Sequence, residues 1–168
     1  MAHHEHHAQD RRSVACALVT VSDTRTPETD GSGIRMRALL EAAGHRIVGQ
    51  VIVPDDPSRV RGHVESLLDD RRVEVVVTSG GTGLAPRDTT YEALASLLEK
   101  RLDGFGELFR SLSFEQIGSA AMLSRAVAGV VRGTVVVVLP GSTAAVDLAL
   151  TRLLVPQLGH MVSLARGE

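Results

Sequence analysis

Short apolar runs alternate with amphipathic stretches along most of this chain. Three runs rich in β-branched residues, at 14–21, 47–53 and 73–77, predict buried strands. Two more, at 126–131 and 135–139, flank Gly133 and predict a β-hairpin. Because these runs are apolar throughout rather than alternating with polar residues, they are typical of a sheet that is covered on both faces.

Helices are expected between these strands. Asp56 followed by Pro57 is typical of a helix start, Thr89 and Glu92 form a predicted capping box, and Ser142 begins the last helix. The side chains at helical spacing that are expected to face the core are Met36, Leu39, Leu40 and Ala43; Val60, Val64, Leu67 and Leu68; Leu94, Leu97 and Leu98; Phe105, Leu108, Phe109 and Leu112; and Val146, Ala149, Leu150, Leu153 and Leu154.

Strands that alternate with amphipathic helices predict an α/β protein. We expect a three-layer α/β/α sandwich with a mostly parallel central sheet. The 168 residues are enough for one domain, which we place at residues 13–165. Residues 1–12 are polar and rich in His, and we expect them to form a disordered tail.

Composition and charge narrow the functional classes. Aromatic residues make up only 2% of the chain, and the formal net charge is -2. Base-stacking platforms and binding of polyanions through bulk charge are therefore disfavoured, and we expect no nucleic-acid partner. The single Cys16 excludes an internal disulfide and a Cys-rich metal site. No signal peptide or long apolar span is found, so we expect a cytoplasmic protein with no membrane partner.

Polar and glycine-rich loops follow four of the predicted strands. In a mostly parallel sheet, the loops at the carboxyl ends of the strands gather along one rim, where ligands bind. We expect this rim to carry Ser22 and Asp23 after the first strand, Asp55 after the second, Gly80, Gly81, Thr82, Gly83 and Asp88 after the third, and Pro140, Gly141 and Ser142 after the last.

The glycines after the third strand favour a ligand site over a simple turn. Without Cβ atoms, their backbone can come close to an anion and present N–H groups to it. Both the P-loop pattern and the dinucleotide-binding glycine pattern are absent, which disfavours the ordinary nucleotidases and dehydrogenases. Pro140–Ser142 could likewise present helix N–H groups to an anion, although Ser142 is equally compatible with an ordinary helix cap.

Asp55 and Asp88 are the candidate metal ligands. Each follows a strand, so both could reach one cleft, and paired carboxylates suit a hydrated Mg²⁺. The alternatives are equally weighted at this point: Asp56 beside Asp55 could simply cap a helix, and Asp88 could pair with Arg87 in a solvated loop. The isolated His45, His63 and His160 are expected to be surface or packing residues.

Several of these segments resemble the MoaB/Mog family of molybdenum cofactor biosynthesis proteins. The stretch VVVTSGGTG at Val75–Gly83, followed by LAPRDTTYEAL, resembles the signature of that family. The segments GFGELFRSLSFEQIGSAAMLSRAVAGVVRG and VVVVLPGSTAA resemble its MoaB branch. The motifs occur in the same order as in the family, and the match covers nearly the whole chain.

The resemblance implies a molybdopterin adenylyltransferase, which is a nucleotidyltransferase. The expected substrates are ATP and molybdopterin, with Mg²⁺ as the cofactor, and the expected assembly is a homotrimer or a homohexamer. The carried-over catalytic and metal-binding residues are Asp55 and Asp88. The carried-over ligand contacts are Ser22, Asp23, Gly80, Gly81, Thr82, Gly83, Ser124, Arg125, Pro140, Gly141 and Ser142. Other molybdenum cofactor synthesis proteins are the implied partners.

Thr143 is a departure from the adenylylating relatives. It follows Pro140–Ser142 as in the MoaB branch, where some members are active and others inactive. A catalytically inactive molybdopterin-binding or carrier oligomer is therefore the main alternative. A nucleotide enzyme like the related domain of CinA-type proteins and an oligomer without a small ligand are further alternatives.

Overall fold

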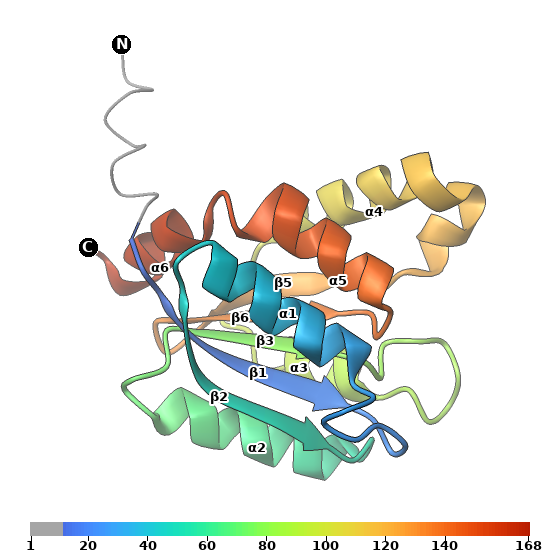
Figure 1. Ribbon diagram of the computed structural model, residues 1–168, viewed down its shortest axis with the longest axis horizontal. Helices are drawn as coiled ribbons and strands as arrows, with labels where there is room; N and C mark the ends of the chain where they lie inside the picture. The colour runs from blue at the N-terminus through green and yellow to red at the C-terminus, as the bar shows by residue number, and fades with distance from the viewer. Residues whose placement is uncertain (1–11) are drawn as a thin grey trace.

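The computed structural model describes residues 12–168, which form one six-stranded sheet between two layers of helices (Figure 1). The strand order is β2-β1-β3-β6-β5-β4. Strands β1, β2, β3 and β6 are parallel, whereas β5 is antiparallel to β6 and β4 is antiparallel to β5. The strands are β1 (Ala15–Val21), β2 (Arg46–Val53), β3 (Val75–Ser79), β4 (Lys100–Arg101), β5 (Val127–Val131) and β6 (Thr134–Leu139).

The helices divide between the two faces of the sheet, which confirms the predicted three-layer α/β/α sandwich. One face is covered by α1 (Gly31–Ala42), α4 (Asp103–Ile117), α5 (Thr143–Ala149) and α6 (Leu158–Arg166) (Figure 1). The other face is covered by α2 (Pro57–Asp69) and α3 (Thr90–Ala95). A 3₁₀ segment, η2 (Gly118–Leu123), follows α4, and a π-helical turn, η3 (Leu150–Leu154), follows α5.

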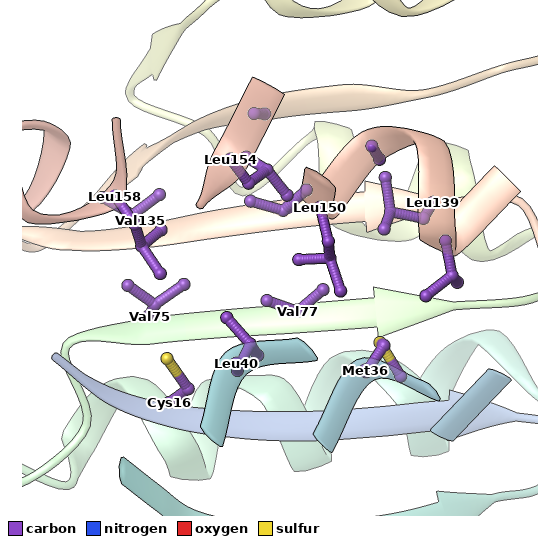
Figure 2. Close-up of a cluster of buried hydrophobic side chains, with 14 of the residues drawn as sticks. Cys16, Met36, Leu40, Val75, Val77, Val135, Leu139, Leu150, Leu154 and Leu158 are labelled. Carbon is purple, nitrogen blue, oxygen red and sulfur yellow. The ribbon is translucent and has the colours of Figure 1, made fainter. Parts of the chain in front are cut away.

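Side chains that alternate along each central strand fill two separate cores. In β1, Cys16 and Leu18 point into one core, and Ala17 and Val19 point into the other. Figure 2 shows the first core, in which Met36 and Leu40 of α1 reach toward β3. Because both faces are covered, every residue of β1, β3 and β6 is buried, as the apolar runs predicted.

Cys16 is part of this core. Its burial raises the pKa of the thiol to about 12, with a smaller contribution from Glu74. The thiolate that would be needed for nucleophilic or redox chemistry is therefore not formed near neutral pH.

The predicted hairpin is confirmed, and its turn explains the glycine. Val131 pairs with Thr134, so only Arg132 and Gly133 connect β5 to β6. Both residues have positive φ, 50° at Arg132 and 77° at Gly133, as the two central residues of a type I′ turn require. This tight turn sets the register between the two strands.

Two local predictions about helices are wrong. Thr89 precedes α3, but its side chain makes no cap hydrogen bond, and the Glu92 carboxylate forms an ion pair with Arg125 instead of completing the box. The single last helix predicted from Ser142 onward is instead divided into α5, the π-helical η3 and α6. Pro156 lies between η3 and α6, where its missing N–H and its ring disfavour a continuous helix.

Strand limits also shift from their predicted positions. The third strand runs from Val75 to Ser79 instead of 73–77, and α6 extends to Arg166. The two-residue β4 was not predicted, because Lys100 and Arg101 carry no apolar signal. Arg12 was placed in the tail, but it pairs with Glu74 and Glu168; the other residues of the predicted tail, 1–11, lie outside the described residues.

No single helix within residues 12–168 is long and apolar enough to cross a membrane; α5–η3 and α6 pass that test only as a pair bent by 67°.

Candidate functional site

Four parallel strands end at the same edge of the sheet and bring the predicted loops together. The register aligns Val21 of β1 with Val53 of β2, and Ser79 of β3 with Leu139 of β6. The loops that begin at Ser22, Pro54, Gly80 and Pro140 therefore leave along one rim, as predicted from the topology.

Asp23 joins the first two of these loops to the third. Its Oδ1 accepts a hydrogen bond from the backbone N–H of Asp55 at 2.9 Å. Its Oδ2 accepts one from Arg87 Nη2 at 2.8 Å. Arg87 therefore pairs with Asp23 and not with its neighbour Asp88, which was the simpler alternative for this loop.

The carboxylate of Asp55 lies in an electrostatically unfavourable place. Burial raises its pKa, and the nearby charges of Asp88 and Asp23 raise it further, whereas Arg87 lowers it. Its Oδ1 is fully buried and has no hydrogen-bond partner among residues 12–168. Asp55 and Asp88 therefore share one site, and a cation there would relieve both the repulsion and the unmet hydrogen-bonding capacity.

Three glycines are needed for the close contacts of the loop after β3. Gly80 and Gly81 have φ values of 104° and 68°, which other residues rarely adopt. A Cβ atom on Gly80 would lie 2.3 Å from the carbonyl oxygen of Val21, and one on Gly81 would lie 2.1 Å from Thr90 Oγ1. A Cβ atom on Gly83 would lie 2.4 Å from Asp88 Oδ2. The glycines thus allow the backbone to touch Asp88 and the neighbouring strand.

The structure shows how two further predicted residues of this loop are held. Asp88 Oδ2 accepts a hydrogen bond from the N–H of Ala85 at 3.2 Å, within the same loop. The Thr82 side chain is buried. The backbone carbonyl oxygen of Thr82 accepts a hydrogen bond from Arg125 Nε at 2.9 Å. Arg125 therefore lies against the glycine loop, 43 residues away in sequence.

Ser124, Pro140 and Ser142 lie together in another part of the rim. They line a small cavity of about 120 Å³ between α4 and α5. Ser142 Oγ accepts a hydrogen bond from the N–H of Ala145 at 3.1 Å, so this hydroxyl caps α5, as one of the two predictions stated. Gly141 connects this part to the glycine loop, because a Cβ atom on it would lie 3.2 Å from the Cα of Gly80.

Two grooves beside the rim were not predicted. They run along the outer edge of β2, with volumes of about 550 and 350 Å³. The larger is lined by Ser22, Arg25, Thr26, Pro27, Gln50, Val51, Ile52 and Pro54; the smaller shares Pro27 and Gln50–Ile52 and adds Asp30, Ile34 and Arg37. Their arginines come from separate elements, so no local motif in the sequence indicates them.

The contacts of Asp30 and His45 support the fold. Asp30 is buried, accepts hydrogen bonds from Thr20 Oγ1 at 2.7 Å and from the N–H of Gly33 at 2.9 Å, and caps α1. His45 is buried away from the rim, and its Nδ1 accepts a hydrogen bond from the N–H of Val14 at 3.3 Å. The expectation that His45 is a packing residue is confirmed.

The mostly parallel sheet, with a glycine-rich loop and polar side chains at the carboxyl ends of its strands, defines an α/β protein with a candidate ligand-binding rim. Residues 17–160 match the family model described as a probable molybdopterin binding domain. The chain therefore belongs to the molybdopterin-binding domain family of molybdenum cofactor biosynthesis proteins.

Individual relatives agree with this assignment. The chain is 46% identical to molybdenum cofactor biosynthesis protein B of Halalkalibacterium halodurans over 163 residues, and this alignment covers 96% of each chain. A crystal structure of molybdenum cofactor biosynthesis protein B superimposes with a TM-score of 0.91 at 46% identity, covering 94% of this chain and 99% of the other. The crystal structure of the tungsten cofactor synthesizing protein MoaB from Pyrococcus furiosus superimposes with a TM-score of 0.80 at 35% identity. The match covers 92% of this chain and 98% of the other. The resemblance to the MoaB/Mog family is thus confirmed, and the chain is a molybdenum cofactor biosynthesis protein.

Proposed function

We propose that this protein adenylylates molybdopterin with ATP and releases pyrophosphate. The observation that carries the proposal is the buried Oδ1 of Asp55, which has no hydrogen-bond partner within residues 12–168 and lies beside Gly81, near Asp88. A glycine backbone and two repelling carboxylates at one rim suit a ligand that brings both phosphate groups and a cation. Because ATP is a cytoplasmic substrate, this activity also implies a cytoplasmic protein.

The residues at the rim fit Mg²⁺, the cofactor implied by the family resemblance. Asp55 and Asp88 are the residues that would hold it. Residues 12–168 contain no group of three or more His, Cys, Asp or Glu side chains arranged to hold a metal. This agrees with Mg²⁺, which is commonly bound through one or two carboxylates, with water and substrate phosphates as the other ligands. When bound, the ion would offset the negative charge of the phosphates.

The proposed reaction needs positioning more than acid–base catalysis. An oxygen of the terminal phosphate of molybdopterin forms a bond to the α-phosphorus of ATP, and the bond from that phosphorus to the bridging oxygen of pyrophosphate breaks. The attacking group is already an anion, so no strong base is required. The loop around Gly80–Gly83 would supply backbone N–H groups to the phosphates, and Asp23 would keep Arg87 and the Asp55 backbone in place.

A turnover assay with matched variants tests this proposal. Purified protein is mixed with molybdopterin, ATP and Mg²⁺, and adenylylated molybdopterin and pyrophosphate are quantified. Asp55→Asn and Asp88→Asn should each reduce turnover by at least about a hundredfold, because each removes a charge that positions the phosphates. Asp56→Asn is the control, since Asn also caps a helix well and α2 needs only an acceptor at this position.

Two results would contradict the proposal, the first its assignment of the site and the second the reaction itself. Full activity of both Asn variants would show that the carboxylates of Asp55 and Asp88 are not needed for the reaction. An inactive wild-type protein that still binds molybdopterin in a calorimetric titration would instead support the carrier alternative. Separate titrations with ATP and with molybdopterin distinguish the enzyme from the carrier. The enzyme requires binding of both, whereas the carrier requires only binding of molybdopterin.

We propose further that the protein forms a closed homo-oligomer, with a trimer favoured over a hexamer by the family resemblance. Five large apolar side chains on or beside α4 and η2 are more than half exposed, up to 77% for Met122. Such a cluster is unusual on a monomer and typical of a contact surface. In Figure 1, α4 and the segment after it extend beyond the sheet. The five residues are Leu108, Phe114, Ile117, Met122 and Leu123.

Light scattering coupled to size-exclusion chromatography tests the assembly. The wild-type mass should be three times the chain mass of 17.9 kDa, or six times for a hexamer. Phe114→Ser together with Met122→Ser should shift the mass toward the monomer, whereas Leu164→Ser on the exposed side of α6 should leave it unchanged. A monomeric wild-type protein would refute the assembly without bearing on the adenylylation assay.

A further inference from the structure

The guanidinium of Arg125 connects the two ends of the loop that carries the glycines and Asp88. Its Nε donates to the carbonyl oxygen of Thr82 at 2.9 Å, and its Nη2 donates to the carbonyl oxygen of Gly83 at 2.7 Å. The same Nη2 lies 3.3 Å from the carbonyl oxygen of Asp88, at the far end of the loop. One side chain from the segment before β5 thus holds three carbonyl groups of a loop that follows β3.

The helix after this loop holds Arg125 in place. Arg125 Nη1 forms an ion pair with the carboxylate of Glu92, in the first turn of α3. That hydrogen bond is the main reason why the pKa of Glu92 is lowered. The guanidinium carbon also lies 4.9 Å from the centre of the Tyr91 ring, within the range of a cation–π contact. The Arg125 side chain is 23% exposed, and all three of its nitrogens have partners within the protein.

These contacts have a consequence for the direction of the loop N–H groups. In a planar trans peptide, the N–H of the next residue points opposite to the carbonyl. Because Arg125 holds the carbonyls of Thr82, Gly83 and Asp88, the N–H groups of Gly83, Leu84 and Thr89 point away from the positive charge. Their donors are therefore oriented by Arg125 before any ligand is bound.

We propose that Arg125 is a positioning residue, which fixes the loop between Thr82 and Asp88 so that its N–H groups and the Asp88 carboxylate are already aligned for phosphate. This positioning role differs from the direct ligand contact that the family resemblance implied for Arg125. The importance of the loop for catalysis rests on the proposed adenylylation, whereas the clamp itself can be tested in the absence of any ligand.

Hydrogen exchange of the ligand-free protein tests the clamp. Arg125→Lys keeps the charge but loses the planar fork that reaches several carbonyls at once. We expect the amides of Ala85, Asp88 and Thr90, which are hydrogen-bonded within or next to the loop, to exchange about tenfold faster. Exchange in β1 and β6 should not change. Arg35→Lys, which alters an exposed ion pair with Asp147, is the matched control and should leave loop exchange as it is in the wild type.

Glu92→Gln provides a second test that leaves Arg125 in place. It removes the charged partner of the guanidinium, and we expect loop exchange to rise several-fold, by less than in Arg125→Lys. If Arg125→Lys raises exchange throughout the chain because the fold is weakened, Glu92→Gln decides the question. Unchanged loop exchange in Glu92→Gln, or in a well-folded Arg125→Lys variant, would overturn the proposal.

Binding measurements separate positioning from direct contact. We expect Arg125→Lys to weaken binding of a non-hydrolysable ATP analogue with Mg²⁺ together with the faster loop exchange. Weaker binding with wild-type loop exchange would show that Arg125 contacts the ligand directly, and it would overturn the clamp. If the wild-type protein adenylylates nothing, the proposed function fails, but loop exchange still decides whether Arg125 orders the loop.

Discussion

Gly81 lies directly against a buried carboxylate oxygen of Asp55. A Cβ atom on Gly81 would be 3.2 Å from Asp55 Oδ1 and 2.1 Å from Thr90 Oγ1. Both of these oxygens are buried, and neither has a hydrogen-bond partner among the described residues. The glycine backbone therefore passes beside two buried polar side chains whose oxygens lack hydrogen-bond partners among the described residues.

We predict that Gly81→Ala reduces both stability and turnover. The φ of 68° and the clash with Thr90 should lower the free energy of unfolding by about 2 kcal/mol, measured by urea denaturation. Turnover should fall by about a hundredfold, because displacement of the loop moves it away from Asp55. Gly62→Ala in α2 is the control: nothing lies within 4 Å of its Cβ position, and it should gain about 0.5–1 kcal/mol. Wild-type turnover in Gly81→Ala would show that this loop does not bind the substrate.

We expect the ionised carboxylate of Asp55 to lower the stability of the folded protein, although the proposed reaction needs it. Burial and neighbouring carboxylates raise its pKa, so the folded protein holds this proton more tightly than the unfolded chain does. The ionised carboxylate therefore opposes folding once the pH exceeds the raised pKa, and the penalty vanishes below the ordinary value of 3.8. We predict that Asp55→Asn is more stable than the wild type by up to about 1 kcal/mol at neutral pH.

Thermal melts with and without Mg²⁺ can check this trade-off. The stability difference between the Asn variant and the wild type should shrink as the pH falls toward the ordinary Asp pKa. Added Mg²⁺ should raise the melting temperature of the wild type but not of Asp55→Asn. A variant less stable than the wild type at every pH would mean that the carboxylate makes a favourable contact, contrary to its place in the structure.

The sequence predicts the centre of the sheet well because β1, β3 and β6 are buried on both faces. Most positions of these strands are therefore apolar, and the resulting runs stand out from the amphipathic helices. The position of the rim follows from the same topology, since parallel strands place all of their carboxyl ends on one side. Asp55 and Asp88 could therefore be brought together from the chain alone.

What the sequence does not predict depends on contacts between distant residues. Thr89 and Glu92 have the spacing of a capping box, but Arg125 takes the Glu92 carboxylate from a position 33 residues away. Arg87 has Asp88 as its acidic neighbour in the sequence, and only the fold brings Asp23 to it. The grooves along β2 likewise combine side chains from three segments, so no local pattern indicates them.

The stability of the protein should fall in mild acid because of His45. Its burial lowers the pKa of the imidazole, and Nδ1 must stay unprotonated to accept the hydrogen bond from Val14. The contribution of His45 is therefore complete above its ordinary pKa of 6.5 and is lost as the pH falls through that value toward the lowered one. Urea denaturation from neutral pH into this window should show the loss, and His45→Gln should reduce the slope. The half-buried His63 of α2 offers His63→Gln for comparison; burial also lowers its pKa, but His63 is more exposed than His45, so this variant should change the slope less. Equal slopes in His45→Gln and the wild type would refute this assignment.

Glu74 connects the beginning of the described chain to its end, away from the rim. Its carboxylate accepts hydrogen bonds from the N–H of Ala15 at 2.8 Å and from Arg12 at 2.5 Å, and it pairs with Arg166 at 3.1 Å. Because the side chain is only 8% exposed, water cannot easily replace these partners. We predict that Glu74→Gln lowers the free energy of unfolding by about 2 kcal/mol, since two charge-assisted contacts are weakened at once.

The matched control for Glu74 is Glu41→Gln, which removes an exposed ion pair with Arg37 on the surface of α1. It should cost less than about 0.5 kcal/mol, because both side chains are solvated. Turnover per folded molecule should remain at the wild-type level in both variants, since Glu74 lies before β3 and the site follows that strand. Loss of turnover in a folded Glu74→Gln protein would show that the start of β3 transmits strain to the glycine loop. Equal stability losses in the two variants would mean that Glu74 is more hydrated than its burial indicates.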